Sequence, residues 1–110
     1  HPTGRLNFDG GDPTKARDGA DLDLEAIFAA CAETDTLIEI NASPERLDLN
    51  DRQARRALEA GCTLVISTDA HQPAALDNIH YGVAMARRAW ATPDRVANTW
   101  PLAKLLAFLR

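Results

Sequence analysis

Hydrophobic and polar positions along the chain follow two spacings, and together they predict a strand–helix–strand unit. Residues 37–41 (LIEIN) and 62–67 (CTLVIS) are short apolar runs typical of buried strands. Residues 51–60 between them are predicted to be a helix, which Asn50 can cap and for which Gln53 completes a capping box. The starts of the two strands are about 25 residues apart. This order is typical of a parallel βαβ unit.

Helical patterns also flank this unit. Asp23 can cap an earlier helix whose apolar face is predicted to hold Leu24, Ile27, Phe28 and Cys31. A helical stretch from about residue 73 to 90 precedes TPDRV, which offers a Thr cap and a Pro in the first turn. The last stripe is expected to be core and contains Leu102, Leu105, Leu106 and Leu109. Residues 6–20 contain three Gly and three Asp and are predicted to be a loop.

Alternation along each predicted strand separates an apolar face from a more polar one. The apolar faces, which we expect helices to cover, are formed by Ile38 and Ile40 and by Leu64 and Ile66. The polar faces contain Leu37, Glu39 and Asn41 on one strand and Val65, Ser67 and Asp69 on the other. If the extended backbone continues past Asp69, then His71 points to the same place, at the carboxyl end of the strand, where α/β folds have their sites.

Composition narrows the class of protein. The 110 residues fit one modest domain or a piece of a larger one, and 45% apolar with 25% charged residues is a globular composition. The net charge of −4 argues against a free-standing nucleic-acid binder, although bound cations can offset acidic ligands. No stretch could span a bilayer and no signal peptide is present, so we expect a cytoplasmic protein without membrane contact. Cys31 and Cys62 are interpreted as free buried thiols, with a disulfide as the alternative.

Two features suggest that the chain is a fragment. It lacks an initiator methionine, and two parallel strands alone would leave their edges and faces exposed. We therefore expect further strands to precede residue 1.

Asp69 and His71 are the leading candidates for chemistry. Carboxylate oxygen and imidazole nitrogen together suit Zn, Mn or Fe. The spacing Asp-x-His is weak evidence on its own, because Asp69 could simply cap the segment that follows.

Several stretches taken together resemble one family. They are HPTGR, DLDLEAIFAACAE, LIEINASPERLDLND, LVISTDAHQPAALDN and YGVAMARRAW, and the terminal NTWPLAKLLAFLR continues the likeness. The chain resembles the C-terminal part of the PHP (polymerase and histidinol phosphatase) domain of bacterial X-family DNA polymerases. EINASPERLDLND followed by ISTDAH is the specific part, and the likeness covers nearly all residues in order.

The resemblance implies a fold and a metal site. Residues 1–110 would be the C-terminal portion of a distorted seven-stranded β/α (TIM-like) barrel, a fragment of a metal-dependent phosphoesterase domain. Up to three divalent ions, Mn²⁺ or Zn²⁺, would lie at the carboxyl ends of its strands. By resemblance, His1, Asp69 and His71 are metal ligands, and Asp69 and His71 are catalytic. The family's His-x-His pair, further histidines and a glutamate are not in this chain, so we expect it to be inactive alone.

The resemblance also implies a function. The intact parent would be a 3′-to-5′ exonuclease or phosphoesterase that trims DNA 3′ ends in repair, beside a nucleotidyltransferase domain. Its partners would be DNA and the preceding strands of the barrel. The alternatives are a histidinol-phosphatase-like enzyme for small molecules and a non-catalytic module that positions the polymerase. A metal-dependent amidohydrolase is disfavoured by HPTGR and EINA.

Three more residues are candidates for substrate contact or for orienting a ligand. Glu39 needs a partner inside a barrel, and either Arg5 or the second nitrogen of a ligand histidine could supply it. Asn41 could contact substrate or brace the loop after it. Arg5 could hold a phosphate or pair with Glu39. We interpret His80, Arg52, Arg55, Arg56, Arg87 and Arg88 as surface residues, and Trp90 and Trp100 as packing anchors.

Overall fold

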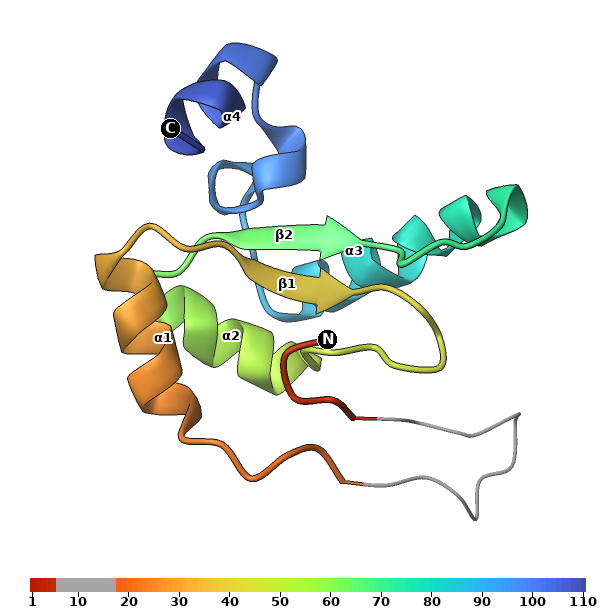
Figure 1. Cartoon of the computed structure of the whole chain (residues 1–110), viewed down its shortest axis with the longest axis horizontal. Helices are drawn as coiled ribbons and strands as arrows, with labels where there is room; N and C mark the ends of the chain where they lie inside the picture. Colours follow the sequence, from red (N-terminus) through yellow and green to blue (C-terminus); the bar gives the residue numbers. More distant parts are fainter. Residues whose placement is uncertain (6–17) are drawn as a thin grey trace.

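The central feature of the fold is a two-stranded parallel sheet. A computed structural model describes residues 1–5 and 18–110, so most of the predicted 6–20 loop lies outside the described residues. Strands β1 (Ile38–Asn41) and β2 (Leu64–Ser67) pair in parallel, with Ile38 opposite Leu64 and Asn41 opposite Ser67. Helix α2 (Asp51–Glu59) connects them, which confirms the predicted βαβ unit (Figure 1).

Local capping signals explain where the first two helices begin. Asn50 Oδ1 accepts a hydrogen bond from Gln53 N at 2.9 Å, and Gln53 Oε1 accepts one from Asn50 N at 3.1 Å, so the predicted capping box is formed. Helix α1 (Leu24–Glu33) begins after Asp23, whose carboxylate accepts from Ala26 N at 3.1 Å. Gly61, with φ of +100°, follows α2 in a conformation that glycine adopts without strain.

One face of the sheet packs against the helices. Helix α3 (Ile79–Arg88) is preceded by a 3₁₀ segment at Pro73–Asn78, close to the predicted helical range. Figure 1 shows α1 and α2 beneath the sheet and α3 behind it. The buried apolar side chains are those of Phe28, Ile38, Ile40, Ala42, Leu49, Ala54, Ala57, Cys62, Leu64, Ile66, Ala86, Ala89 and Val96. The predicted apolar faces of both strands are therefore confirmed.

Gly82 lets α3 approach the sheet closely. A Cβ at this position would lie 2.3 Å from Ile66 Cγ2 and 2.9 Å from Ala42 Cβ, both far inside van der Waals contact. The absence of a side chain at Gly82 thus sets the distance between α3 and the ends of both strands.

The outer edge of β2 is covered by a short irregular segment. Asn98 Oδ1 accepts a hydrogen bond from Ile66 N at 2.7 Å, and Asn98 Nδ2 donates to Ile66 O at 2.9 Å. Val96 forms an isolated parallel bridge with Leu64. These contacts come from residues next to and within the 3₁₀ turn Ala97–Thr99, which follows another 3₁₀ turn at Pro93–Arg95.

The C-terminal segment differs from its prediction. Helix α4 (Leu102–Phe108) stands out from the sheet at the top of Figure 1, and of its apolar stripe Leu105 is half-buried while Leu102 is 68% exposed. Leu106 and Leu109 are exposed as well, and the prediction that this stripe is core is wrong for the described chain. Trp100 does act as a packing residue, since its ring meets Phe108 edge-on at 5.2 Å.

Three smaller predictions are also corrected. Ile27 is exposed, because Phe28 is the side chain of α1 that is fully buried in the core. Thr92 makes no side-chain cap, and its extended backbone leads into one short 3₁₀ turn. Trp90 is 75% exposed, because its φ of +63° turns the chain at the end of α3 and leaves the ring on the surface.

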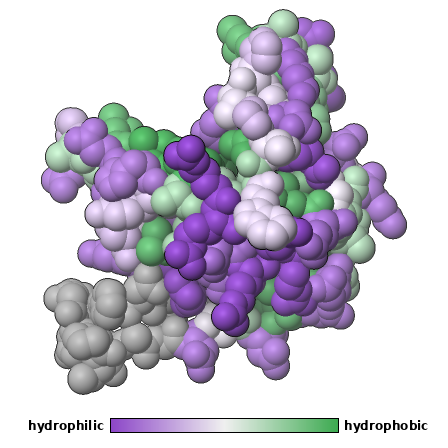
Figure 2. All heavy atoms as spheres, turned by 180° about the vertical axis from the view of Figure 1, so that it is seen from behind, coloured by the Kyte–Doolittle hydropathy of each residue, from purple (hydrophilic) through white to green (hydrophobic). Residues whose placement is uncertain are grey.

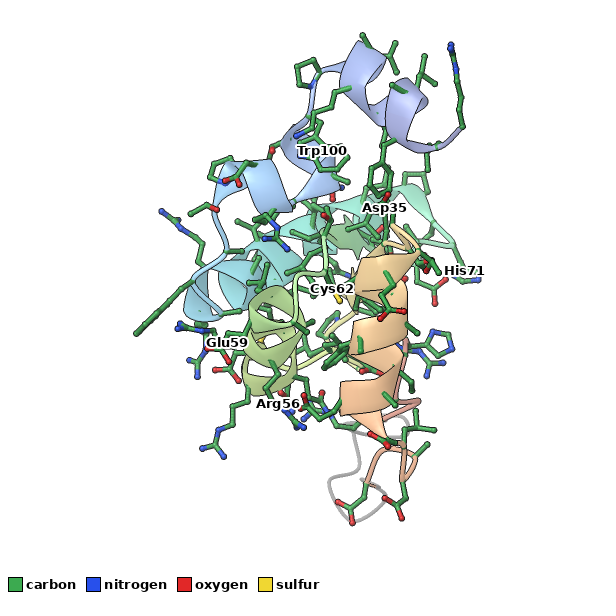
Figure 3. The ribbon with its side chains drawn as sticks, turned by 90° about the vertical axis from the view of Figure 1, so that its left-hand side faces the viewer. Asp35, Arg56, Glu59, Cys62, His71 and Trp100 are labelled. Atoms are coloured by element: carbon green, nitrogen blue, oxygen red, sulfur yellow. The ribbon has the colours of Figure 1, made fainter. Side chains whose placement is uncertain are left out.

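Both cysteines are free thiols, as predicted. Cys62 is buried between α1 and α2 (Figure 3), where its Sγ donates to Phe28 O at 3.2 Å, whereas Cys31 is half-buried. Burial raises the pKa of the Cys62 thiol. Within the described residues, every helix is too short or too polar to cross a bilayer.

Candidate functional site

The candidate site lies where β2 ends. Asp69 has a φ of +52°, so the backbone turns there and the predicted extended path toward His71 is wrong. Asp69 and His71 nevertheless line the same open hollow of about 450 Å³. The turn places both residues on this hollow by a different backbone route from the one that the sequence suggested.

Two segments build this hollow at the carboxyl end of the sheet. The loop after β1 contributes Ser43, Pro44, Glu45 and Arg46, and the chain after β2 contributes Thr68, Asp69, His71, Gln72, Ala75 and Asn78. The location agrees with the prediction that the carboxyl ends of the parallel strands carry the site. The lining is mostly polar, as a site for a charged substrate requires.

The tautomer of His71 is fixed by its surroundings. His71 Nδ1 lies 2.7 Å from Asp69 O, and a carbonyl oxygen can only accept, so Nδ1 carries the hydrogen. This leaves the lone pair of Nε2 available to a metal ion or a proton. His80 has a similar bond from Nδ1 to Asp77 O, but it is not among the residues that line the hollow.

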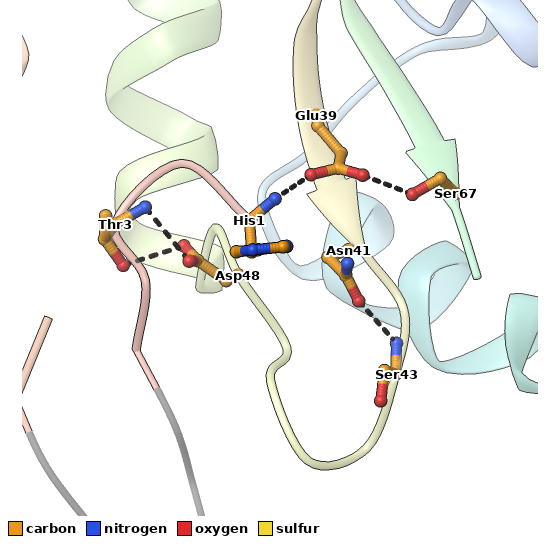
Figure 4. A network of polar contacts seen from close by, with 7 residues as sticks. All are labelled: His1, Thr3, Glu39, Asn41, Ser43, Asp48 and Ser67. Carbon is orange, nitrogen blue, oxygen red and sulfur yellow. Dashed lines mark hydrogen bonds and ion pairs between the residues drawn. The ribbon is translucent and has the colours of Figure 1, made fainter. Parts of the chain in front are cut away.

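His1 reaches the sheet through Glu39. The amino nitrogen of His1 donates to Glu39 Oε2, and Ser67 Oγ donates to Glu39 Oε1 (Figure 4). This network links residue 1 to the last residue of β2, two positions before Asp69. Among the described residues, no three His, Cys, Asp or Glu side chains are grouped to hold a metal, so a shared ion between His1 and Asp69 stays a prediction.

Arg5 and Asn41 have different roles from each other. Arg5 Nη2 donates to Leu47 O at 3.4 Å, so the suggested pairing of Arg5 with Glu39 is wrong. The oxygens of Glu39 instead accept hydrogen bonds from Ser67 and from His1. Asn41 Oδ1 accepts from Ser43 N at 3.0 Å, which confirms that it braces the loop after β1. Arg5 Nε and Asn41 Nδ2 are buried without a hydrogen-bond partner among the described residues.

A buried carboxylate that sequence reasoning missed holds the first residues in place. Asp48, only 1% exposed, accepts hydrogen bonds from Thr3 N at 3.0 Å and from Thr3 Oγ1 at 2.8 Å. Asp48 also forms an antiparallel bridge with Asn41. The contact fastens the HPTGR segment to the loop after β1 (Figure 4). Its only sequence signal is a Thr in one motif and an Asp in another, 45 residues apart.

Comparisons with known proteins identify three relatives of the chain. No family model matches the chain. The "DNA polymerase/3′-5′ exonuclease PolX" of Bacillus subtilis (strain 168) is 39% identical over 110 residues, which is 100% of this chain and 18% of PolX. Probable phosphatases of Shewanella sp. strains ANA-3 and MR-4 are 31% identical over 94 residues, 80% of this chain and 37% of each phosphatase. The chain thus spans only a minor part of each of these relatives.

Proposed function

We propose a catalytic role for this chain, on the premise that it is a relative of PolX, to which it is similar along all 110 residues. Residues 1–110 would form the C-terminal part of a PHP domain, and the intact protein would use that domain as a metal-dependent 3′-to-5′ exonuclease acting on DNA ends in repair. The similarity to probable phosphatases supports phosphoester chemistry more broadly.

The observation that carries the proposal is the shared hollow of Asp69 and His71. A carboxylate and an imidazole with a free Nε2 lie on one polar hollow at the carboxyl end of a strand. This donor set fits Mn²⁺ or Zn²⁺. When bound, such ions would supply an activated water and positive charge for the phosphoryl group.

The remaining residues of the site would position these two. Glu39 holds Ser67 and the His1 backbone, so it fixes the end of β2 from which Asp69 follows. Asn41 holds the loop that forms the opposite wall of the hollow. Arg5, whose Nε is buried without a partner in the described part of the chain, would donate to a phosphate oxygen. A cluster of up to three ions would need His1 and ligands from other strands of the barrel.

The test compares ligand variants with a matched histidine control in the full-length protein. Asp69→Ala and His71→Ala are expected to abolish release of nucleotides from a 3′-labelled DNA strand in Mn²⁺, with unchanged thermal unfolding. His80→Ala removes an exposed imidazole with the same bond from Nδ1 to a carbonyl, and should keep full activity. Wild-type activity in both ligand variants would remove Asp69 and His71 from the mechanism.

A small-molecule phosphatase is the second candidate, and the likeness to the probable phosphatases favours it. The same variants can be assayed with histidinol phosphate and with the DNA strand. Faster hydrolysis of the small monoester than of DNA would favour the phosphatase. If purified protein loaded with Mn²⁺ or Zn²⁺ hydrolyses neither substrate, the domain is a non-catalytic module that positions the polymerase.

A further inference from the structure

A second hollow, on the helix layer, has an unusual lining. It has a volume of about 360 Å³ and is lined by Asp51, Arg52, Arg55, Arg56, Arg88 and Trp90, which we call the Arg–Trp surface. Four arginines and one aspartate line it, and with Glu59 and Glu25, which pair with Arg55 and Arg56, the local balance is four cations against three carboxylates, whereas the whole chain has a net charge of −4. Figure 3 shows Arg56 and Glu59 on the outer side of α2, on the other side of the molecule from His71. The back face that Figure 2 presents is covered mainly by hydrophilic side chains across its middle.

Trp90 stands where the backbone alone favours glycine. It follows the C-cap Ala89 of α3, has a φ of +63°, and donates from its N to Arg87 O at 3.0 Å, while Ala91 N donates to Ala86 O at 2.9 Å. A left-handed residue at this place in a helix end is usually Gly, because a side chain there costs about 1 kcal/mol or more. The indole is also 75% exposed, so it contributes little to the core. Neither the backbone nor the core accounts for a tryptophan here.

The arginines around Trp90 are available to an outside ligand. The Arg55 guanidinium carbon lies 4.0 Å from the centroid of the Trp90 ring, and the residue is 75% exposed, so the indole has surface to offer for stacking. Arg55 pairs with Glu59, Arg56 with Glu25 and Arg88 with Asp51, all at the surface, where such pairs are weak and can be exchanged. Arg52 has no ion-pair partner among residues 1–5 and 18–110.

We propose that the Arg–Trp surface binds single-stranded DNA, with a base stacked on Trp90 and neighbouring phosphates held by Arg52 and Arg55. An exposed indole accepts an unpaired base regardless of its sequence, and Arg52, together with arginines whose surface ion pairs can be exchanged, offers donors to the phosphate backbone. This inference rests on the proposed function in one respect: the proposed exonuclease is the reason for taking DNA as the single-stranded ligand. The loop after β1 lines the candidate site and leads directly into α2, so one continuous segment connects both hollows.

Binding is measured by fluorescence anisotropy on the full-length protein. The probe is a labelled oligodeoxythymidylate longer than the ~4–16 nucleotides that single-strand sites cover. An Asp69→Ala background prevents its digestion. Trp90→Gly suits the left-handed backbone and should leave the thermal unfolding temperature unchanged or higher, yet weaken binding roughly tenfold to hundredfold. Trp90→Phe keeps a stacking ring and should restore most of the affinity.

Arg52→Gln should lower the slope of log K against log salt by about 0.7, the value for one phosphate contact on a single strand. Arg87→Gln is the matched control, because Arg87 is also an exposed helical arginine but lies on α3 and lines a different hollow. Photo-crosslinking with 5-iodouracil-substituted DNA should label the peptide that contains Trp90. Hydrolysis of the small ester bis(p-nitrophenyl) phosphate by the protein with Asp69 intact should be unaffected by Trp90→Gly.

The outcomes separate this inference from the proposed nuclease. Unchanged affinity in Trp90→Gly and Arg52→Gln, with no crosslink at Trp90, overturns the DNA-binding surface even if the protein is an active exonuclease. Loss of affinity in these variants supports the surface even if Asp69→Ala shows that Asp69 has no role in hydrolysis.

Discussion

Replacing Gly82 with alanine is expected to destabilise the protein, although alanine favours a helix more than glycine does. Two terms oppose each other. Alanine should stabilise α3 by about 1 kcal/mol through its helix propensity. Its Cβ, however, would lie 2.3 Å from Ile66 Cγ2 and 2.9 Å from Ala42 Cβ, whereas carbon atoms prefer separations of about 3.5–4.0 Å.

The steric term should be the larger of the two. Ile66 is buried and its strand is fixed on both sides, so α3 or β2 must move by about 1 Å to restore contact distances. Overpacking of this kind costs about 1–3 kcal/mol and occasionally more. We therefore expect Gly82→Ala to lower the free energy of unfolding by up to about 2 kcal/mol after the helix propensity is included.

The assay is hydrogen exchange of the β2 and α3 amides, which reports local opening without assuming two-state unfolding of a larger protein. Val83→Ala, an exposed change on the next residue of α3, is the control and should alter exchange little. Ile66→Ala removes the Cγ2 that is in the way. In the double variant the two changes should therefore couple favourably by about 0.5–3 kcal/mol. A Gly82→Ala variant more stable than the wild type would refute this account of the α3 contact.

Further predictions concern one hydrogen bond, one ion pair and one thiol. Thr3→Val removes a donor to the buried Asp48 carboxylate and should reduce protection of the first residues against exchange by about 1.5–3 kcal/mol. The hydrogen bond from Arg88 lowers the pKa of Asp51, so the stability from this pair is present above the ordinary pKa and is lost as pH falls through the lowered one. Because the pair is exposed, the loss should be only a few tenths of a kcal/mol, measured as the difference between wild type and Asp51→Asn from pH 7 down to pH 2. Burial raises the pKa of Cys62, so iodoacetamide at pH 8 should alkylate it far more slowly in the native than in the unfolded protein.

Local signals were sufficient for the βαβ unit. The Asn50–Gln53 capping box lies within four consecutive residues. The two faces of each strand follow from the alternation of side-chain direction along it. The leucine stripe of α4 has the same spacing as a buried helix, but burial depends on what packs against it, and three of its four leucines are exposed in the described part of the chain. Spacing therefore predicted the helix and failed to predict its environment.

The site was predictable in its residues and less so in its geometry. Asp69 and His71 share a hollow as expected, yet through a left-handed turn at Asp69 that alternation cannot reveal. The Glu39–Ser67 contact depends on strand register, and the Thr3–Asp48 contact joins distant segments. Such tertiary contacts are set by the packing of the whole fold, so neither motif alone indicates them.

The side-chain amide of Asn98 has a consequence for the assembly of the sheet. Its side-chain amide hydrogen-bonds to both the N–H and the C=O of Ile66, as the backbone of a neighbouring strand would. An exposed parallel edge invites a second polypeptide to extend it, which leads to aggregation and domain swapping. Asn98 therefore keeps another strand from pairing with Ile66 at this edge of β2.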